Sequence, residues 1–384
     1  MRPAERIRTL PPYLFASLDA KLAARRAQGV DVISLGVGDP DLPTPDYVLD
    51  AMREALADPA THRYPSYVGS AEFRGAVAEF YLRRFGVELD PETEVMALIG
   101  SKEGLGHLSF AFVDPGDEAL VPDPGYPVYA TSTRLAGGTP VSLPMPAERG
   151  FLPDLAAAPV SARTKVLWLN FPTNPTAATC ELDTFEEAVA FAREHDLLLA
   201  HDAAYSEITF DGHVAPSVLQ VPGARDVALE FGSLSKLFNM TGWRIGWAVG
   251  SAEALRALGV VKTNLDSGQF TAIQRAAAAA LAQPFDVLDG IRETYRRRRD
   301  LLVGTLNGLG WAVEPPRGSC YVWVPVPAGE TSTSFADRLL DRAGVFVAPG
   351  SGYGERGEGY VRFSLTVADD RLDEALARLR ETLA

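Results

Sequence analysis

The stretch KVLWLNFPTNPTAATCELDTFEEAVAFAREHDLLLAHD, residues 165–202, decides the fold of this chain. It begins and ends with short apolar runs, each as long as a buried strand. Between them, apolar side chains recur every three or four positions at Leu182, Phe185, Val189 and Ala192, which predicts an amphipathic helix. A strand, a helix and a second strand in this order are typical of a parallel sheet covered by helices, so the sequence predicts the α/β class.

The same alternation extends on both sides of this stretch. Strands are expected at EVMALIG (94–100), EALVPDP (118–124), KVLWLNFP (165–172), LLLAHD (197–202), VALEFGS (227–233) and IGWAVG (245–250). After Pro284 the pattern changes to a long charged helix, short strands and an amphipathic terminal helix, which predicts a smaller α+β domain. We therefore expect an N-terminal arm that returns to the small domain (1–45), a large domain with a mostly parallel sheet flanked by helices (46–284), and a small C-terminal domain (285–384).

The composition excludes several kinds of partner. With 36 basic and 50 acidic residues, the net charge of -14 would repel nucleic acid and anionic membrane surfaces. The one basic run, Arg296 to Arg299, lies in a helical pattern and is interpreted as a solvated helix face. No segment approaches the roughly 20 apolar residues of a membrane helix. No histidine spacing indicates a metal site, and two cysteines far apart in sequence fit a reducing cytoplasm.

One lysine follows directly after a predicted core strand, Lys236 in SLSKLFNMTGWRIG (233–246). Lysine is seldom buried unless it is paired or takes part in chemistry, although a solvated loop is the commoner setting for an isolated lysine. Ligands of open α/β sheets bind beyond the carboxyl ends of the strands, so the loops there should form one site. Those loops contain Gly100 to Lys102, Pro124 to Tyr126, Asn174, Asp202 with Tyr205, and Ser233 to Arg244.

An anion is expected at one end of this site. GSKEGLGHLSFAF (100–112) begins where a strand ends and a helix starts, so free N–H groups near Ser101 face the pocket. Ser233 and Arg244 could add a hydroxyl and a bidentate guanidinium to the same dianion. Taken alone, Ser101 is more simply a helix cap and Arg244 a surface arginine. A P-loop motif is absent and GVGDPD (36–41) lacks the third dinucleotide glycine, so a nucleotide is not expected.

A heterocyclic ring would satisfy the remaining side chains. Asp202 ends a buried strand, where a carboxylate is costly unless it is paired, and a protonated ring nitrogen would pair with it. Tyr126 could stack on the ring, while Asn174 and Tyr205 could hydrogen-bond a ring oxygen. Each of these residues also has an ordinary explanation as a turn, cap or core residue, and only their joint position on successive strand ends favours a ligand.

A ring with a phosphate, a basic nitrogen and a hydroxyl, beside a lysine that can form a Schiff base, is pyridoxal phosphate. Lys236 would hold this cofactor and, once displaced by a substrate amine, move the proton between the substrate Cα and the cofactor's C4′.

On these motifs the chain resembles, nearly from end to end, a class I/II aminotransferase of pyridoxal-phosphate fold type I. The resemblance implies Lys236, Asp202 and Tyr205 as catalytic residues. It implies a homodimer with shared active sites, because Tyr64 of YPSYVG would reach the neighbouring subunit's phosphate. The cofactor-binding residues it implies are Ser101, Lys102, Tyr126, Asn174, Asp202, Tyr205, Ser233, Ser235, Lys236, Arg244 and Tyr64. The substrate-binding residues it implies are Gly38 of LGVGDPD, Tyr126, Asn174 and Arg362 of EGYVRFSLT, which grips the substrate carboxylate.

Within the family, ALIGSKEGLGH (97–107), HDAAYSEI (201–208) and NLDSGQFTAIQ (264–274) look most like LL-diaminopimelate aminotransferases. That likeness implies lysine biosynthesis, with Tyr13 and Lys102 as further substrate contacts. Other amino donors (alanine, glutamate, aspartate or aromatic amino acids) stay open, as do elimination at a carbon–sulfur bond and a regulator that binds the cofactor without turnover. Two positions depart from the family pattern: Ala177 replaces a glycine, which would be strained at positive φ, and Leu237 follows the lysine.

Overall fold

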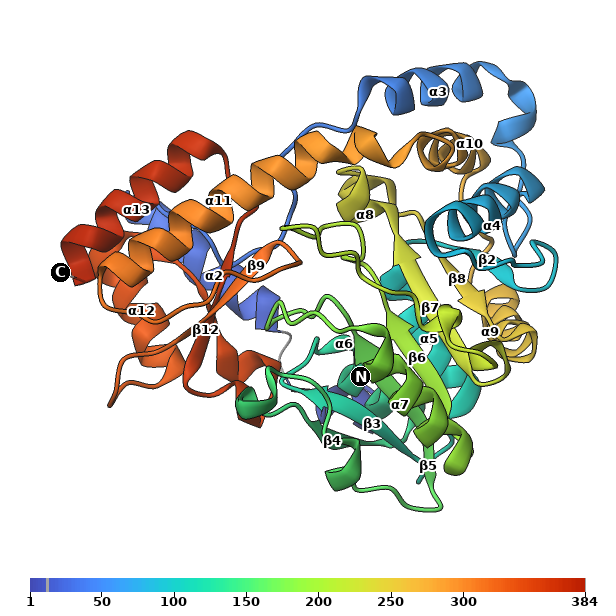
Figure 1. The fold of residues 1–384 in the computed structure, drawn as a ribbon, viewed down its shortest axis with the longest axis horizontal. Coiled ribbons are helices and arrows are strands. Elements are labelled where there is room, and N and C mark those ends of the chain that lie inside the picture. Colours follow the sequence, from blue (N-terminus) through green and yellow to red (C-terminus); the bar gives the residue numbers. More distant parts are fainter. Residues whose placement is uncertain (12–13, 384) are drawn as a thin grey trace.

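A seven-stranded sheet forms the centre of the larger lobe (Figure 1). The computed structural model describes residues 1–11 and 14–383, apart from the side chains of residues 14–19. The strand order is β2-β8-β7-β6-β5-β3-β4, and within this sheet β8 is the one strand that runs opposite to the others. The strands are β2 Val95–Leu98, β3 Glu118–Asp123, β4 Thr139–Pro144, β5 Thr164–Asn170, β6 Leu198–Asp202, β7 Ala228–Ser233 and β8 Gly246–Gly250. The prediction of an α/β fold with a mostly parallel sheet is confirmed.

Helices cover both faces of this sheet. Because successive strand residues point to opposite faces, β5 directs Val166 and Trp168 toward one apolar layer and Leu167 and Leu169 toward the other. The first layer contains side chains of α5, α6 and α9, and the second those of α4, α7 and α10. The helices of this lobe are α3 Asp46–Ala57, α4 Ala71–Phe85, α5 Ser101–Phe112, α6 Val128–Ala136, α7 Leu182–Glu194, α8 Leu234–Leu237, α9 Ala252–Leu265 and α10 Thr271–Leu281.

The edge strand β4 has no counterpart among the predicted strands. It pairs with β3, and most of its side chains are exposed or half-buried. Its sequence, TPVSLP, contains Pro140 and Pro144. Proline cannot donate to a β-ladder and is tolerated on an edge strand, so a short run with two prolines gives little strand signal.

The smaller lobe combines C-terminal elements with part of the N-terminal segment (Figure 1). Strands β9 Tyr321–Pro325, β11 Ala348–Pro349 and β12 Tyr360–Ser364 form an antiparallel sheet, and β1 Ile33–Ser34 pairs in parallel with β10 Val345–Phe346. Leu22 of α2 packs in an apolar cluster with Trp323 and Phe346. The helices of this lobe are α2 Leu14–Ala27, α11 Asp289–Gly308, α12 Ser332–Ala343 and α13 Asp369–Leu383, whereas α1 Glu5–Arg8 contacts α6 of the larger lobe.

Short 3-10 helices occur in the connections. They are η1 Pro59–His62, η2 Ala147–Arg149, η3 Leu155–Ala157, η4 Val218–Gln220, η5 Ala224–Asp226, η6 Thr241–Trp243, η7 Phe285–Leu288, η8 Gly350–Tyr353 and η9 Glu355–Gly357.

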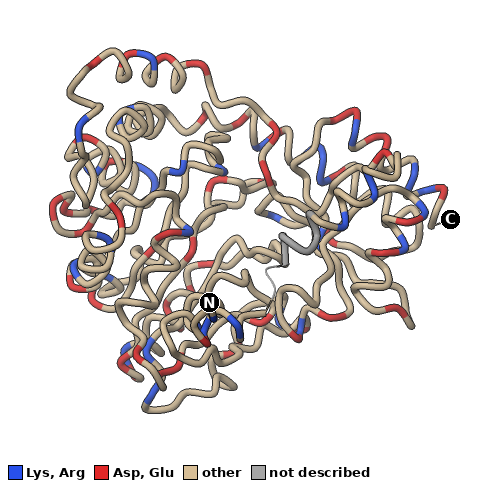
Figure 2. The backbone as a smooth tube through the Cα atoms, turned by 180° about the vertical axis from the view of Figure 1, so that it is seen from behind, with Lys and Arg blue, Asp and Glu red and all other residues tan. Residues whose placement is uncertain are grey.

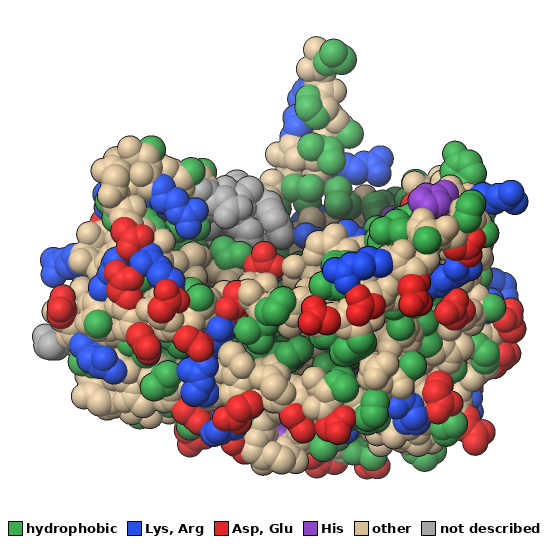
Figure 3. Space-filling model, turned by 90° about the horizontal axis from the view of Figure 1, so that it is seen from above, with side chains coloured by type: hydrophobic (Ala, Val, Ile, Leu, Met, Phe, Trp, Pro, Cys, Tyr) green, Lys and Arg blue, Asp and Glu red, His purple; other side chains and the backbone are tan. Residues whose placement is uncertain are grey.

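Acidic and basic residues are interspersed along both lobes in Figure 2 and over the face seen in Figure 3. Within residues 1–11 and 14–383, no helix is long and apolar enough to cross a bilayer.

The interpretation of Arg296 to Arg299 as a solvated helix face is wrong for two of these arginines. Arg298 and Arg299 of α11 are 2% and 3% exposed. Arg298 forms a bidentate ion pair with Asp41, with N–O distances of 2.7 and 2.8 Å, and Arg299 pairs with Asp211. Carboxylates distant in sequence make this burial possible, and helical periodicity alone cannot reveal them.

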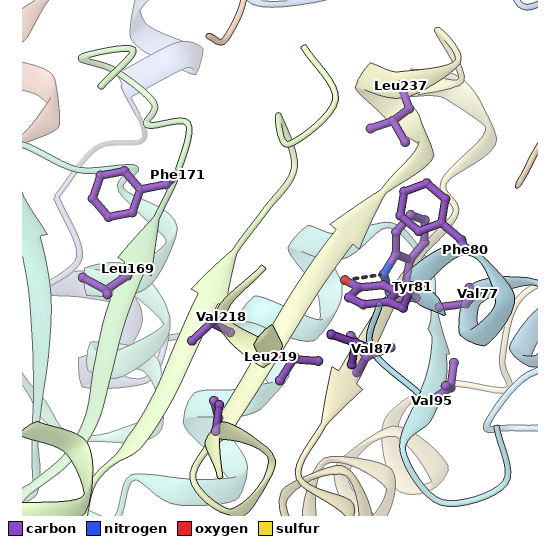
Figure 4. Packing of buried hydrophobic residues seen from close by; sticks show 14 of the residues in the cluster. Val77, Phe80, Tyr81, Val87, Val95, Leu169, Phe171, Val218, Leu219 and Leu237 are labelled. Atoms are coloured by element: carbon purple, nitrogen blue, oxygen red, sulfur yellow. Dashed lines mark hydrogen bonds between the residues drawn. The ribbon is translucent and has the colours of Figure 1, made fainter. Parts of the chain in front are cut away.

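One buried carboxylate, Glu230 of β7, lies within the layer that contains the side chains of α4 and α7. Its side chain is 1% exposed. It accepts hydrogen bonds from Tyr81 Oη at 2.8 Å, Ser217 Oγ at 2.9 Å and Val218 N at 2.9 Å, and His201 Nδ1 lies 2.9 Å from Oε2. Figure 4 shows Tyr81 and Val218 among the apolar side chains of this layer. The hydrogen bonds offset the cost of burying the charge.

Replacing Glu230 with alanine is expected to lower the free energy of unfolding by about 3–5 kcal/mol, because several buried donors would lose their acceptor. Urea unfolding of wild type and variant measures the difference. Glu314→Ala is the matched control: Glu314 is exposed, and its loss should change stability by no more than about 0.5 kcal/mol. A loss below about 1 kcal/mol for Glu230→Ala would contradict this role.

Candidate active site

A cavity of about 300 Å³ lies where loops after the parallel strands meet the smaller lobe. Loops following β5, β6 and β7 form one side, and β9, β12 and the loop after β1 form the other. The predicted site residues that line it are Gly38, Ser101, Lys102, Tyr126, Asn174, Asp202, Tyr205, Ser233, Ser235, Lys236, Arg244 and Arg362.

Among the predicted site residues that the structure describes, Tyr64 is not among those lining the cavity. Tyr64 is 91% exposed on the surface of the chain. Its predicted contact is with a neighbouring subunit, so this position within one chain leaves that prediction untested. Tyr13 lies outside the described residues.

Lys236 enters the cavity from α8, which begins immediately after β7. Ser233 caps this short helix, because its Oγ accepts a hydrogen bond from Ser235 N at 3.2 Å. Lys236 Nζ donates to the carbonyl oxygen of Gly38 at 2.7 Å. Burial lowers the pKa of Lys236 below the ordinary lysine value. The neutral, nucleophilic amine therefore forms at a lower pH than on an exposed lysine.

Gly100 and Arg244 form a cradle at the N-terminus of α5. Gly100 is the N-cap residue and has a φ of 75°. A Cβ atom at Gly100 would lie 2.2 Å from Arg244 Nη2, and one at Gly246 would lie 2.8 Å from Ser101 N. The missing side chains let the guanidinium and the helix N-terminus approach each other closely. Backbone N–H groups at a helix start, a guanidinium and nearby serine hydroxyls are the donors that suit a phosphate.

Asp202 is a buried carboxylate at the end of β6 and is 5% exposed. Tyr129 Oη donates to its Oδ2 at 2.8 Å, and Ala204 N donates to Oδ1 at 3.3 Å. Tyr129 is held in turn by stacking on Trp168, with ring centroids 4.9 Å apart. Burial raises the pKa of Asp202 above the ordinary aspartate value. Neither donor carries a charge that would neutralise the ionised carboxylate. A cationic group in the cavity would therefore be stabilised by pairing with Asp202.

Arg362 of β12 lies on the wall formed by the smaller lobe and is 1% exposed. Its Nη1 donates to Asn174 Oδ1 at 2.7 Å and its Nη2 to Gly36 O at 2.6 Å. The guanidinium carbon lies 3.9 Å from the centre of the Tyr321 ring, and Tyr321 Oη lies 2.8 Å from Tyr205 Oη. These contacts fix the orientation of the guanidinium, whose planar fork matches a carboxylate.

The sequence pattern does not identify Tyr129 and Tyr321 as site residues. Tyr129 follows Tyr126 by three positions inside a helical pattern, so it was indistinguishable from a core aromatic. Tyr321 belongs to an apolar strand of the smaller lobe and reaches the cavity only because that lobe packs against the larger one. The strand-end rule used for the parallel sheet does not extend to such a residue.

The two departures from the family pattern have different structural consequences. Ala177 has a φ of 59°, so this chain does place a side chain in the left-handed region that favours glycine. Leu237 is 2% exposed and belongs to the apolar layer on the α4 face of the sheet.

Glu103, His107 and Asp266 form a cluster with metal-ligand chemistry beside α5, since one ligand atom from each lies within 4.8 Å of the others. Lys262, however, donates to Glu103 Oε2 at 3.1 Å and to Asp266 Oδ2 at 3.0 Å. The ammonium of Lys262 thus already occupies one oxygen of each carboxylate, and we assign no metal to this cluster.

The fold and this cavity define the class of the protein as a fold type I aminotransferase, judging by structures of the same architecture. The family model "Aminotransferase class I and II" matches residues 30–379. The chain belongs to this family.

Individual relatives are similar over their whole length. LL-diaminopimelate aminotransferase of Desulforudis audaxviator is 57% identical over 382 residues, which cover 99% of this chain and 97% of the relative. The enzyme of the same name from Moorella thermoacetica is 54% identical, covering 100% and 99%. Among solved structures, aspartate aminotransferase from Thermus thermophilus with maleate is 36% identical, with a TM-score of 0.92 and full coverage of both chains.

Proposed function

We propose that this aminotransferase uses pyridoxal phosphate and transfers an amino group of LL-diaminopimelate to a 2-oxo acid such as 2-oxoglutarate. The observation that carries the proposal is the cavity, whose wall contains Lys236, Asp202, Arg244 and Arg362. The substrate part rests on relatives named LL-diaminopimelate aminotransferase, of which several are 50–57% identical.

The residues present fit this cofactor. The cradle with Ser101, Ser233 and Ser235 would hold the phosphate, and Asp202 would hold the protonated ring nitrogen. The ring itself would contact residues already predicted from the sequence: Tyr126 would stack on it, and Asn174 and Tyr205 would hydrogen-bond its hydroxyl oxygen. When bound, pyridoxal phosphate supplies an electron sink for the negative charge that develops on the substrate Cα.

The chain's own residues then perform three tasks. Lys236 would hold the cofactor through its amine and, once displaced by the substrate amine, would move the proton between the substrate Cα and C4′. Asp202 would keep the ring nitrogen protonated by pairing with it. Arg362 holds the α-carboxylate in a bidentate pair, and the contacts with Asn174 and Gly36 orient it beforehand. Because this carboxylate is gripped, loss of carbon dioxide is disfavoured relative to transfer of nitrogen.

Two charged residues on the cavity wall suit a diaminopimelate side chain. Asp39 and Lys102 both line the cavity, and they carry opposite charges. The far end of diaminopimelate bears an ammonium and a carboxylate, which would be costly to bury without partners. We propose that Asp39 attracts the ammonium and Lys102 the carboxylate. The fold alone does not select this substrate, because proteins of similar structure include aspartate, aromatic and probable N-succinyldiaminopimelate aminotransferases.

We also propose a cytoplasmic homodimer. Tyr64, Val68, Val260 and Leu265 are exposed to solvent in the single chain, and Val68 and Val260 line one shallow apolar hollow. A second copy would cover these side chains and bring Tyr64 near its active site. Sedimentation at micromolar concentration checks this proposal, and a monomer would contradict it.

The test of the proposed function is steady-state transamination with 2-oxoglutarate and a panel of LL-diaminopimelate, alanine, aspartate, glutamate and an aromatic amino acid. Glutamate itself is tested with pyruvate as acceptor. LL-diaminopimelate should give the highest kcat/KM by about tenfold or more, because one correctly paired charge is worth at least this much discrimination. A higher kcat/KM for another donor would remove the substrate assignment, and release of pyruvate and ammonia from cysteine-type substrates would indicate a carbon–sulfur lyase.

A further inference from the structure

The backbone at Arg244 adopts a conformation that ordinary residues avoid. Arg244 has φ and ψ of 56°, in the left-handed region. Such a conformation is unfavourable for a residue with a Cβ and persists only where the surroundings hold it. The same residue places its guanidinium against Gly100 in the cradle. The position of the Arg244 guanidinium in the cradle therefore depends on the contacts that stabilise this turn.

Gln269 stabilises the turn directly. Its Nε2 donates to Trp243 O at 2.9 Å and also to Arg244 O. Its Oε1 accepts from Phe270 N at 3.1 Å, so both ends of the amide are used. Gln269 is 8% exposed and its hydrogen bonds to these two carbonyls are partly buried, so removing the donor would destabilise the turn.

A second glutamine, Gln274, holds the first in place. It is fully buried, and its Nε2 donates to Gln269 O at 2.6 Å. Its Oε1 accepts from Ser70 N at 2.6 Å, and it lies beside Gly69. The two side chains connect the Arg244 turn to the segment that follows Tyr64. The backbone of Gln269 is thus held by a hydrogen bond from a buried side chain.

We propose that Gln269 is a positioning residue for phosphate binding, acting through Arg244. It is not among the residues that line the cavity, so its effect is indirect. This inference rests on the proposed function, because the phosphate is that of the cofactor. Gln269 lies in NLDSGQFTAIQ (264–274), a stretch that carries the family likeness, but that likeness gave this residue no role.

The test compares two ligands of the apoenzyme, pyridoxal phosphate and pyridoxal, which lacks the phosphate. Gln269→Met keeps the approximate shape but removes both donors. It should weaken binding of pyridoxal phosphate about tenfold, as measured by absorbance titration, and leave pyridoxal binding unchanged within about twofold. Gln269→Asn keeps an amide and should therefore lose less affinity for pyridoxal phosphate than Gln269→Met. Gln283→Met is the matched control, since the Gln283 amide bonds only Ala279 O at 3.3 Å in α10, as far as the described residues show.

A second comparison, in the Arg244→Ala variant, distinguishes an effect that acts through Arg244 from general destabilisation of the protein. In Arg244→Ala, which already lacks the guanidinium, adding Gln269→Met should cause no further loss of pyridoxal phosphate affinity. Equal weakening of both ligands by Gln269→Met, an additive loss in the Arg244→Ala background, or unchanged affinity would each overturn the inference. If the wild type itself fails to bind pyridoxal phosphate, the proposed function fails instead, so the two failures are distinguishable.

Discussion

Lys236→Ala is expected to lower the rate of transamination by at least about 10⁴-fold. In the proposed function, the Lys236 amine attaches the cofactor and moves the proton between the substrate Cα and C4′, and the substitution would remove both roles. Lys102 is the other lysine on the cavity wall, but it lies on α5 and not on the loop after β7, so it should not replace Lys236. A single-turnover assay with LL-diaminopimelate measures the loss, and the visible absorbance band of a lysine-linked cofactor should disappear.

Lys236→Arg provides the control for charge. Arginine restores a cation near Gly38 but cannot lose its proton to act as nucleophile or base. It should therefore be as inactive as Lys236→Ala. Turnover within about tenfold of wild type for either variant would remove Lys236 from the catalytic role.

Asp202→Ala is expected to lower the single-turnover rate by about 10³-fold while the visible band is retained. The cofactor would still be attached through Lys236, but its ring nitrogen would lose the carboxylate that keeps it protonated. Tyr129→Phe is a graded variant, because it removes only the 2.8 Å hydrogen bond to Asp202, and it should cost about tenfold. Near-normal rates for Asp202→Ala would contradict the assignment.

The same carboxylate predicts a pH dependence of cofactor binding. Burial raises the pKa of Asp202 in the apoenzyme, so at acidic pH the side chain holds a proton that the cationic ring nitrogen must displace. Affinity for pyridoxal phosphate should therefore rise as pH increases through this raised pKa. Asp202→Asn should lose that part of the dependence, leaving the contributions of Lys236 and the phosphate. The same dependence of pyridoxal phosphate affinity on pH in wild type and Asp202→Asn would contradict this role of Asp202.

Much of the fold could be predicted from local pattern. Each of the six expected apolar runs overlaps a strand of the central sheet, because strands buried on both faces are continuously apolar. β4 could not be found, since an edge strand with two prolines lacks that pattern. Arg298 and Arg299 were misinterpreted, since their partners Asp41 and Asp211 lie far away in sequence. Burial of charge depends on tertiary contacts that periodicity does not encode.

The site divides in the same way. Residues at the ends of parallel strands, such as Asn174, Asp202 and Ser233, could be grouped by one rule, and they do line one cavity. Tyr129 and Gln269 act through neighbours, on Asp202 and on the Arg244 turn, and nothing in their local sequence signals this. Supporting contacts are visible only when the packing around a site is known.

The measurement that tests the central claim most directly is the absorbance change when LL-diaminopimelate is added, without an acceptor, to enzyme loaded with pyridoxal phosphate. We predict loss of the visible band and formation of one equivalent of 2-oxo acid, followed by recovery of the band when 2-oxoglutarate is added. An unchanged spectrum with this and with every other amino acid of the panel would contradict the account.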